Sequence, residues 1–308
     1  MTLQQLEYVV AVYRNRHFAQ AARSCGVTQP TLSAMVQKLE QELGVTLFRR
    51  GPQQVTVTPV GEQIAEQAAR VLSAAGRITQ LADEERNLLH GILNVGVLPT
   101  IAPYLLPRFF PALCQELPDV QVRATELRTE QLLAELRNGT LDVAIAALLP
   151  EVEPFQPVPL YYEPFMAYVS RQNALFAQSR IKTEQLQHVK LLLLDDGHCF
   201  GRQLERFCHL PSASYSRRAF RLEGLETFMR MVEVGDGLTI IPQLCALQLT
   251  SQQQELVRPF AVPEPVRTIV LLRRPDFARQ GLLSLLVEHI RACVPPELLT
   301  LPPTAMRV

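Results

Sequence analysis

The chain has 308 residues, with 30 basic and 30 acidic side chains and an apolar fraction of 47%. This length allows two or three domains, and the composition excludes a disordered or low-complexity protein. No uncharged apolar run approaches the ~18 residues of a membrane span, and the amino terminus lacks a basic region followed by an apolar run. We therefore expect a cytoplasmic protein without a membrane partner.

The net charge of zero conceals an uneven distribution. Residues 1–60 carry six Arg or Lys side chains and three Glu, a net charge of +3, so the remaining residues sum to −3. A basic module on an acidic body favours a polyanionic partner, although a surplus of this size also arises by chance.

Three helices are predicted near the amino terminus. Apolar residues recur at helical spacing over 3–13, and a second short helix begins at Phe18 and ends near Gly26, which permits a left-handed turn. Thr28 is a candidate N-cap for a third helix with Pro30 in its first turn. This pattern is typical of a helix-turn-helix, whose second helix reads base edges in the DNA major groove. The alternative is a three-helix bundle without a ligand.

Two short strands around a turn are predicted over 45–58. Strands in this position form the wing of a winged helix-turn-helix. Arg49 and Arg50 lie where they can reach phosphate groups or the minor groove.

A long helix with an apolar seam is predicted over 59–89. The seam residues follow one another at alternating spacings of four and three: Ile64, Ala68, Val71, Ala75, Ile78, Ala82 and, further on, Leu89. This short heptad pattern favours a dimerisation helix, and the alternative is a surface helix that packs on its own domain.

After residue 90 the predicted elements alternate between strand and helix. The strands are 92–98, 120–126, 142–149, 165–170, 189–194, 238–241 and 268–273, and the helices are 105–117, 129–138, 225–234 and 282–294. Such alternation is typical of an α/β fold with buried parallel strands.

Cys199 and Cys208 are nine residues apart. If the segment between them is helical, their Cα atoms lie about 13 Å apart on opposite faces of the helix. A disulfide requires a Cα separation below about 7 Å, so the helix must unwind before the bond can form. The other four cysteines (25, 114, 245 and 293) are interpreted as structural thiols.

Motifs of the amino-terminal module carry a family resemblance. They are Phe18-x-x-Ala-Ala, Thr28-Gln-Pro-Thr-Leu-Ser, Lys38-Leu-Glu-x-Glu-Leu-Gly, Leu47-Phe48-x-Arg and Thr58-Pro-x-Gly61. Together they resemble the winged helix-turn-helix of LysR-type transcription regulators. The resemblance implies double-stranded DNA as a partner, contacted through Gln29, Pro30, Thr31, Ser33, Lys38, Arg49 and Arg50. It also implies a homodimer or homotetramer, and RNA polymerase as a further partner.

The family resemblance implies three domains. Residues 1–58 would form the winged helix-turn-helix, 59–90 the linker and dimerisation helix, and 91–308 a two-lobed periplasmic-binding-protein-like α/β regulatory domain. Lobe I would comprise about 91–162 and 267–308, and lobe II about 163–266. In this family the cleft between the lobes holds the effector.

Within the family, the chain resembles the members that sense hydrogen peroxide. The resemblance covers essentially the whole chain, and its most specific element is Gly197-His198-Cys199 followed by Cys208. It implies that Cys199 is the peroxidatic thiol and Cys208 the resolving thiol, and that a thiol reductant resets the protein. Further implied roles are peroxide binding by Thr100, Thr129 and His198, and stabilisation of the Cys199 thiolate by Arg267.

One departure from the peroxide-sensing members follows the reactive cysteine. They usually carry Arg-Asp where this chain has Gly201-Arg202. The resemblance implies that this aspartate assists the peroxide step, so we expect its absence to change the sensitivity to peroxide.

We predict a DNA-binding transcription regulator, not an enzyme, that detects hydrogen peroxide through Cys199 and controls oxidative-stress genes. No cofactor is expected, and no metal site, because no fourth ligand accompanies His198, Cys199 and Cys208 at usable spacing. One alternative is a LysR-type regulator that binds a small organic effector in the cleft between the lobes. Another is a thiol peroxidase, which would leave the DNA-binding module unexplained.

Overall fold

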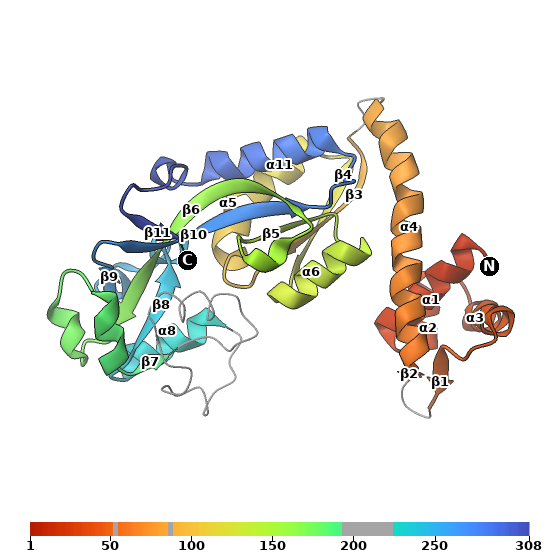
Figure 1. Ribbon diagram of the computed structural model, residues 1–308, viewed down its shortest axis with the longest axis horizontal. Helices are drawn as coiled ribbons and strands as arrows, with labels where there is room; N and C mark the ends of the chain where they lie inside the picture. The colour runs from red at the N-terminus through yellow and green to blue at the C-terminus, as the bar shows by residue number, and fades with distance from the viewer. Residues whose placement is uncertain (52–54, 86–88, 193–223, 308) are drawn as a thin grey trace. The chain divides into compact units, whose positions relative to one another are not determined.

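The computed structural model describes residues 1–51, 55–85, 89–192 and 224–307 (Figure 1). The chain divides into two compact units. One contains Met1–Leu88 with Glu135–Leu141, and the other contains Leu89–Ala134 with Asp142–Val308. Within the described ranges, no helix is both long enough and apolar enough to cross a membrane.

A winged helix-turn-helix forms the start of the first unit. Its elements are α1 (Leu3–Asn15), α2 (Phe18–Ser24), α3 (Gln29–Leu43), β1 (Phe48–Arg50) and β2 (Val55–Val57), the two strands pairing antiparallel. Val9, Leu32 and Leu39 are fully buried in its core. The three predicted helices and the predicted strand pair are confirmed.

The long helix α4 (Pro59–Glu85) begins directly after the hairpin. Thr58 Oγ1 accepts a hydrogen bond from the backbone N of Gly61 at 3.0 Å. A Cβ atom on Gly61 would lie 2.2 Å from the carbonyl oxygen of Leu47, so only glycine allows this close approach. Leu89, predicted as the last seam residue, is described and is not helical.

A mixed sheet forms the framework of the second unit, with the strand order β4-β3-β5-β10-β6-β8-β7 (Figure 1). The strands are β3 (Gly91–Val97), β4 (Val120–Glu126), β5 (Val143–Ala147), β6 (Gln156–Val169), β7 (Leu191–Leu192), β8 (Leu238–Pro242), β9 (Val257–Pro259), β10 (Glu264–Arg273) and β11 (Ala305–Arg307). β3 pairs in parallel with β4 and β5, as predicted. β10, β6 and β8 pair antiparallel, so the sheet is only partly parallel.

Helices alternate with these strands along the chain. The longer ones are α5 (Ala102–Glu116), α6 (Thr129–Asn138), α8 (Leu225–Val234) and α11 (Gln280–Cys293), and the short ones include α9 (Gln243–Ala246) and α10 (Ser251–Gln254). The residues of α6 from Glu135 onward belong to the first unit. Each of the four predicted helices corresponds to one of the longer ones, whereas α9 and α10 were not predicted. The α/β fold is confirmed.

Strand β6 passes through both parts of the sheet. It pairs with β10 as far as Pro164, and Phe165–Val169 pairs with β8. The sequence predicted only the second part, because Pro157, Pro159 and Pro164 are unfavourable within a central strand. In the described part of the chain, the first part of β6 pairs with β10 on one side only, and prolines are tolerated in a strand that has an unpaired side. Strand β6 changes its partner at 164/165, close to the predicted crossing between the lobes, and the lobe boundaries stay a prediction.

Candidate functional site

The amino end of α3 presents polar side chains on its exposed side. Thr28 Oγ1 accepts a hydrogen bond from the backbone N of Thr31 at 3.4 Å and lies 2.8 Å from the Thr31 hydroxyl oxygen, which fixes the first turn. The predicted DNA-contact residues on this helix are exposed, except for the half-buried Ser33: Gln29, Pro30, Thr31 and Lys38. Because the opposite side of α3 is buried, this polar side is the one available to DNA.

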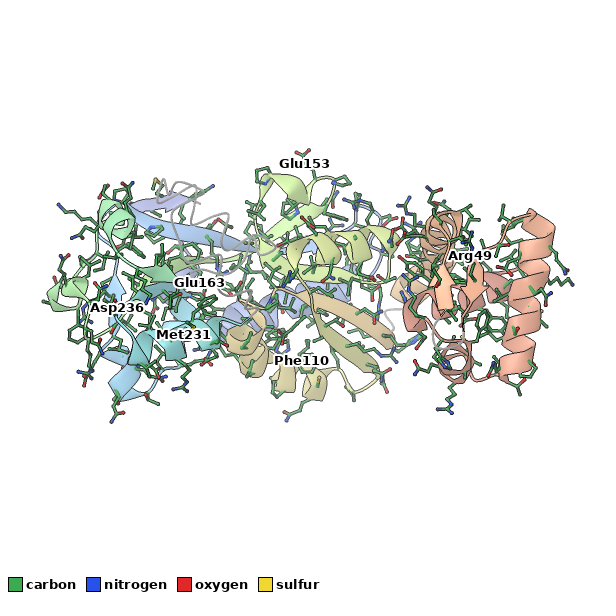
Figure 2. All side chains as sticks on the ribbon, turned by 90° about the horizontal axis from the view of Figure 1, so that it is seen from below. Arg49, Phe110, Glu153, Glu163, Met231 and Asp236 are labelled. Carbon is green, nitrogen blue, oxygen red and sulfur yellow. The ribbon has the colours of Figure 1, made fainter. Side chains whose placement is uncertain are left out.

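A glutamate of α3 anchors the wing. Glu40 Oε1 accepts hydrogen bonds from the backbone N atoms of Leu47 at 2.6 Å and Phe48 at 3.1 Å. These bonds fix the strand that carries Arg49, whose side chain is exposed (Figure 2). Arg50 belongs to the same strand, and its side chain lies outside the described residues. The sequence did not identify Glu40 as the anchor, although its motif contains this residue.

Helix α4 exposes an apolar stripe from Val71 onward. Val71, Ile78 and Leu81 are 37%, 73% and 59% exposed. Ile64 and Ala68, which were also predicted for the seam, instead pack into the core of their own unit. The predicted seam is therefore divided, and only its second half is available to another chain.

Thr100 and Thr129 follow two neighbouring parallel strands at equivalent positions. Val97 of β3 lies opposite Glu126 of β4, and each threonine is the third residue after its strand. Both strands thus end at the same edge of the sheet, where α/β proteins bind ligands. Both threonines are buried, and Thr129 Oγ1 has no hydrogen-bond partner among the described residues. A buried hydroxyl without a partner is rare in native proteins, so Thr129 is a candidate for a ligand contact.

Arg267 of β10 lies directly opposite Glu163 of β6, next to the point where β6 changes partner. The two side chains are 0% and 1% exposed and form an ion pair with an Nη2–Oε2 distance of 2.7 Å. Arg267 Nη1 donates a hydrogen bond to Thr100 Oγ1 at 3.0 Å. The structure therefore brings together two of the predicted site residues, Thr100 and Arg267.

The sequence analysis did not identify Glu163 as a site residue. A signal was present, because Glu163 is the only charged residue in the apolar run 160–169. A lone acidic residue in such a run requires a partner when it is buried. Its partner lies 104 positions away, so the pair emerges only from the paired strands.

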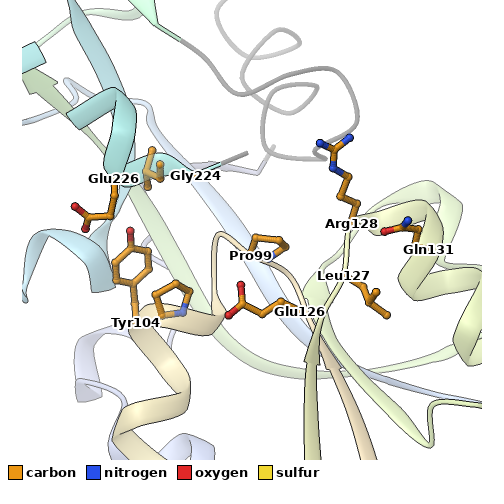
Figure 3. Close-up of a pocket in the computed structure, with 10 residues that line it drawn as sticks. Pro99, Tyr104, Glu126, Leu127, Arg128, Gln131, Gly224 and Glu226 are labelled. Atoms are coloured by element: carbon orange, nitrogen blue, oxygen red, sulfur yellow. The ribbon is translucent and has the colours of Figure 1, made fainter. Parts of the chain in front are cut away.

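A cavity of about 600 Å³ lies at the same edge of the sheet (Figure 3). Its lining includes Pro99, which precedes Thr100, with Arg128 and Gln131 around Thr129. Tyr104 from α5 lies near Glu226 at the start of α8 (Figure 3). The cavity has the volume of a small-molecule site, as the alternative of an organic effector requires.

The remaining predicted site residues lie outside the described residues. They are Cys199, Cys208 and His198, together with the departure Gly201-Arg202. The predicted contact of Arg267 with the Cys199 thiolate thus stays a prediction. In the described ranges, no group of three or more His, Cys, Asp and Glu side chains could hold a metal ion.

The other four cysteines differ in their surroundings. Burial raises the pKa values of Cys25 and Cys293, and it raises the pKa of Cys245 to about 12. A thiol with a raised pKa is a poor nucleophile toward peroxide. Cys114 is exposed, so packing in the core does not explain why a cysteine occupies this position.

Two family models match the chain. The model of bacterial regulatory helix-turn-helix proteins of the lysR family matches residues 3–62. The model of the LysR substrate binding domain matches residues 86–294.

Known proteins resemble the chain over nearly its full length. It is 38% identical over 291 residues to a hydrogen peroxide-inducible genes activator from Dickeya chrysanthemi, which covers 94% of this chain and 95% of the relative. A full-length OxyR mutant from Pseudomonas aeruginosa is structurally similar, with a TM-score of 0.78, 37% identity and coverage of 96% of this chain and 99% of that one. An H2O2-bound OxyR mutant from Corynebacterium glutamicum has a TM-score of 0.64 and 31% identity, covering 95% of this chain and 92% of that one.

Proposed function

The chain belongs to the LysR family of bacterial transcription regulators, and from this premise we propose that it senses hydrogen peroxide and controls oxidative-stress genes. The observation that carries the proposal is the grouping of Thr100 with Arg267 at one edge of the sheet. The same edge carries the Thr129 hydroxyl, which has no hydrogen-bond partner among the described residues. Hydroxyl donors and a buried cation suit a reaction in which a small oxidant takes up negative charge. The similarity to hydrogen peroxide-inducible activators supports the same reaction.

The first chemical step is the oxidation of Cys199. Its thiolate attacks one oxygen of hydrogen peroxide, a sulfur–oxygen bond forms, and the oxygen–oxygen bond breaks. The second oxygen leaves as hydroxide and takes up a proton to become water. Thr100, Thr129 and His198 bind the peroxide and stabilise the leaving oxygen, and Arg267 favours the thiolate form of Cys199.

The second step forms the disulfide. The Cys208 thiolate attacks the sulfenic sulfur of Cys199, a second hydroxide leaves and is protonated to water, and the segment between the cysteines rearranges. A rearrangement that costs about 3 kcal/mol would raise the reduction potential of the disulfide by about 60 mV, so that a cellular dithiol can reduce it again.

The assembly that we propose follows the family pattern. Two chains pair through the exposed half of α4, with further pairing into a tetramer, and the domains are 1–58, 59–90 and 91–308. In the cytoplasm, the DNA-binding units contact double-stranded DNA and act on RNA polymerase. Refolding between Cys199 and Cys208 would change the pairing of the subunits and so the placement of these units. The protein is thus a regulator that is oxidised by peroxide and reduced again by a thiol, rather than an enzyme.

Mass spectrometry of the reduced full-length protein after sub-stoichiometric peroxide tests the function. We expect a loss of two hydrogens and a peptide that crosslinks Cys199 to Cys208. A regulator of the alternative kind, which binds an organic effector, would show no such crosslink. An unmodified Cys199 after peroxide treatment would therefore refute peroxide sensing through this thiol.

We expect Arg49→Ala to weaken binding to every DNA sequence and to reduce the slope of log affinity against log salt by about one unit, because one phosphate contact is lost. Binding titrations at several salt concentrations measure this slope. Arg123→Ala is the matched control, since Arg123 is an exposed arginine on β4 of the other unit. Equal slopes for Arg49→Ala and the control would show that Arg49 does not contact a DNA phosphate.

A further inference from the structure

The guanidinium group of Arg267 is held on two of its edges. Nε and Nη2 donate to Oε2 of Glu163 at 2.9 and 2.7 Å, and Nη1 and Nη2 donate to the hydroxyl and carbonyl oxygens of Thr100 at 3.0 and 3.1 Å. The Phe165 ring centroid lies 5.6 Å from its central carbon. Because the group is planar and rigid, the edge bound by Glu163 determines where the other edge points.

Glu163 is itself firmly placed. Its Oε1 accepts a hydrogen bond from the backbone N of Leu244, in the first turn of α9, at 3.0 Å. Its Oε2 is occupied by Arg267, which lies opposite it on the neighbouring strand. The carboxylate is 1% exposed and lies inside its unit (Figure 2), so bulk water does not compete for these bonds. It is therefore a fixed support for the arginine.

This support sets the direction of the Thr100 hydroxyl. Oγ1 accepts a hydrogen bond from a cation, so its own hydrogen must point toward a different acceptor. Among the described residues, none accepts that hydrogen. A donor bond from a charged group also polarises the hydroxyl and strengthens it as a donor.

A donor directed in this way suits the reduction of peroxide, because negative charge develops on the oxygen that leaves. We infer that Glu163 is a positioning residue for this reaction, which acts through Arg267 to hold the Thr100 hydroxyl as a donor toward the peroxide. The inference rests on the proposed function. Without the Glu163 carboxylate, Arg267 loses the acceptor of its Nε bond and of one Nη2 bond, so its contact with the Thr100 hydroxyl is no longer held in one direction.

A double-mutant cycle on the oxidation rate tests this inference. The second-order rate constant for Cys199 oxidation by hydrogen peroxide is measured by stopped flow in four full-length reduced proteins: the parent, Glu163→Gln, Thr100→Val and the double variant. Glutamine keeps the size of the side chain and one acceptor oxygen. We expect each single change to lower the rate constant about tenfold, and the double change to lower it about tenfold as well, because both remove the same donor.

The outcomes separate the inference from the function on which it rests. A merely structural role of Glu163 would make the two effects multiply, to about a hundredfold in the double variant, and would overturn the inference. An unchanged rate in Glu163→Gln would overturn it too. If peroxide does not oxidise Cys199 in the parent protein, the proposed function itself is refuted, whatever the Glu163 variants show. The same rate constants are measured with Glu163→Asp in place of Glu163→Gln. Aspartate keeps the charge on a shorter side chain, so a folding defect of the glutamine variant does not decide the result.

Discussion

Replacing Cys199 with serine should abolish the response to peroxide while DNA binding keeps the affinity of the reduced protein. A serine hydroxyl is not ionised at neutral pH and does not attack peroxide, whereas the residues that we propose to contact DNA belong to the other unit. Transcription from a target promoter before and after peroxide, together with DNA binding by the purified variant, measures both properties. We expect the induced signal to fall to the uninduced level.

The accompanying variants assign the two thiols their separate roles. Cys208→Ser should halt the reaction at the sulfenic acid, which a sulfenic-acid-specific probe would capture on Cys199. Cys114→Ser is the matched control, since Cys114 is an exposed cysteine of the same unit and should respond like the parent. A Cys199→Ser protein that still induces transcription would count decisively against the assignment.

Replacing Thr129 with valine should lower the reactivity toward peroxide without lowering the stability of the fold. The side chains have nearly the same shape, and the buried Thr129 hydroxyl has no hydrogen-bond partner among the described residues. Removing an unpaired buried hydroxyl should leave the free energy of unfolding unchanged or raise it by about 1 kcal/mol. The rate constant for oxidation by peroxide should nevertheless fall about 10- to 100-fold, because one donor to the leaving oxygen is lost.

Thr100→Val provides the contrast. The Thr100 hydroxyl accepts a hydrogen bond from a buried cation, so its removal should lower the free energy of unfolding by about 1.5–3 kcal/mol as well as the rate. Chemical denaturation and stopped-flow oxidation measure the two quantities on the same samples. If Thr129→Val destabilises the protein and oxidises at the parent rate, Thr129 has a structural role and does not bind peroxide.

The local elements of the fold were predictable because short-range signals determine them. Thr28 caps α3, and Gly26 adopts a left-handed φ of 66° at the turn before it, as the sequence indicated. Apolar periodicity likewise predicted the four longer helices that follow residue 90. These features depend on neighbours a few positions away along the chain.

Long-range pairing explains what the sequence did not predict. The first part of β6 contains three prolines and is a strand only because β10 pairs with it. β11 likewise depends on its parallel pairing with β10. Such partners lie far apart in the sequence, so no local pattern specifies them.

The candidate site shows the same difference between local signals and long-range pairing. The family resemblance predicted Thr100, Thr129 and Arg267 as residue types at given positions. The contact between Thr100 and Arg267 depends on the strand order β3-β5-β10, and the position of Thr129 at the same sheet edge depends on the register of β3 with β4. Glu163 was missed because its role exists only across the pairing of β6 with β10. Cys199, Cys208 and His198 lie outside the described residues, so their roles rest on the chemistry and on the resemblance.

Hydrogen exchange of the reduced and the disulfide-bonded full-length protein, compared peptide by peptide, tests most directly whether the bond requires refolding. We expect backbone protection to change across 199–208 on oxidation, while peptides of β3 and β5 exchange alike in both states. A disulfide between Cys199 and Cys208 that forms with identical protection throughout this segment would show that the two sulfurs meet without any rearrangement, and would contradict the proposed switch.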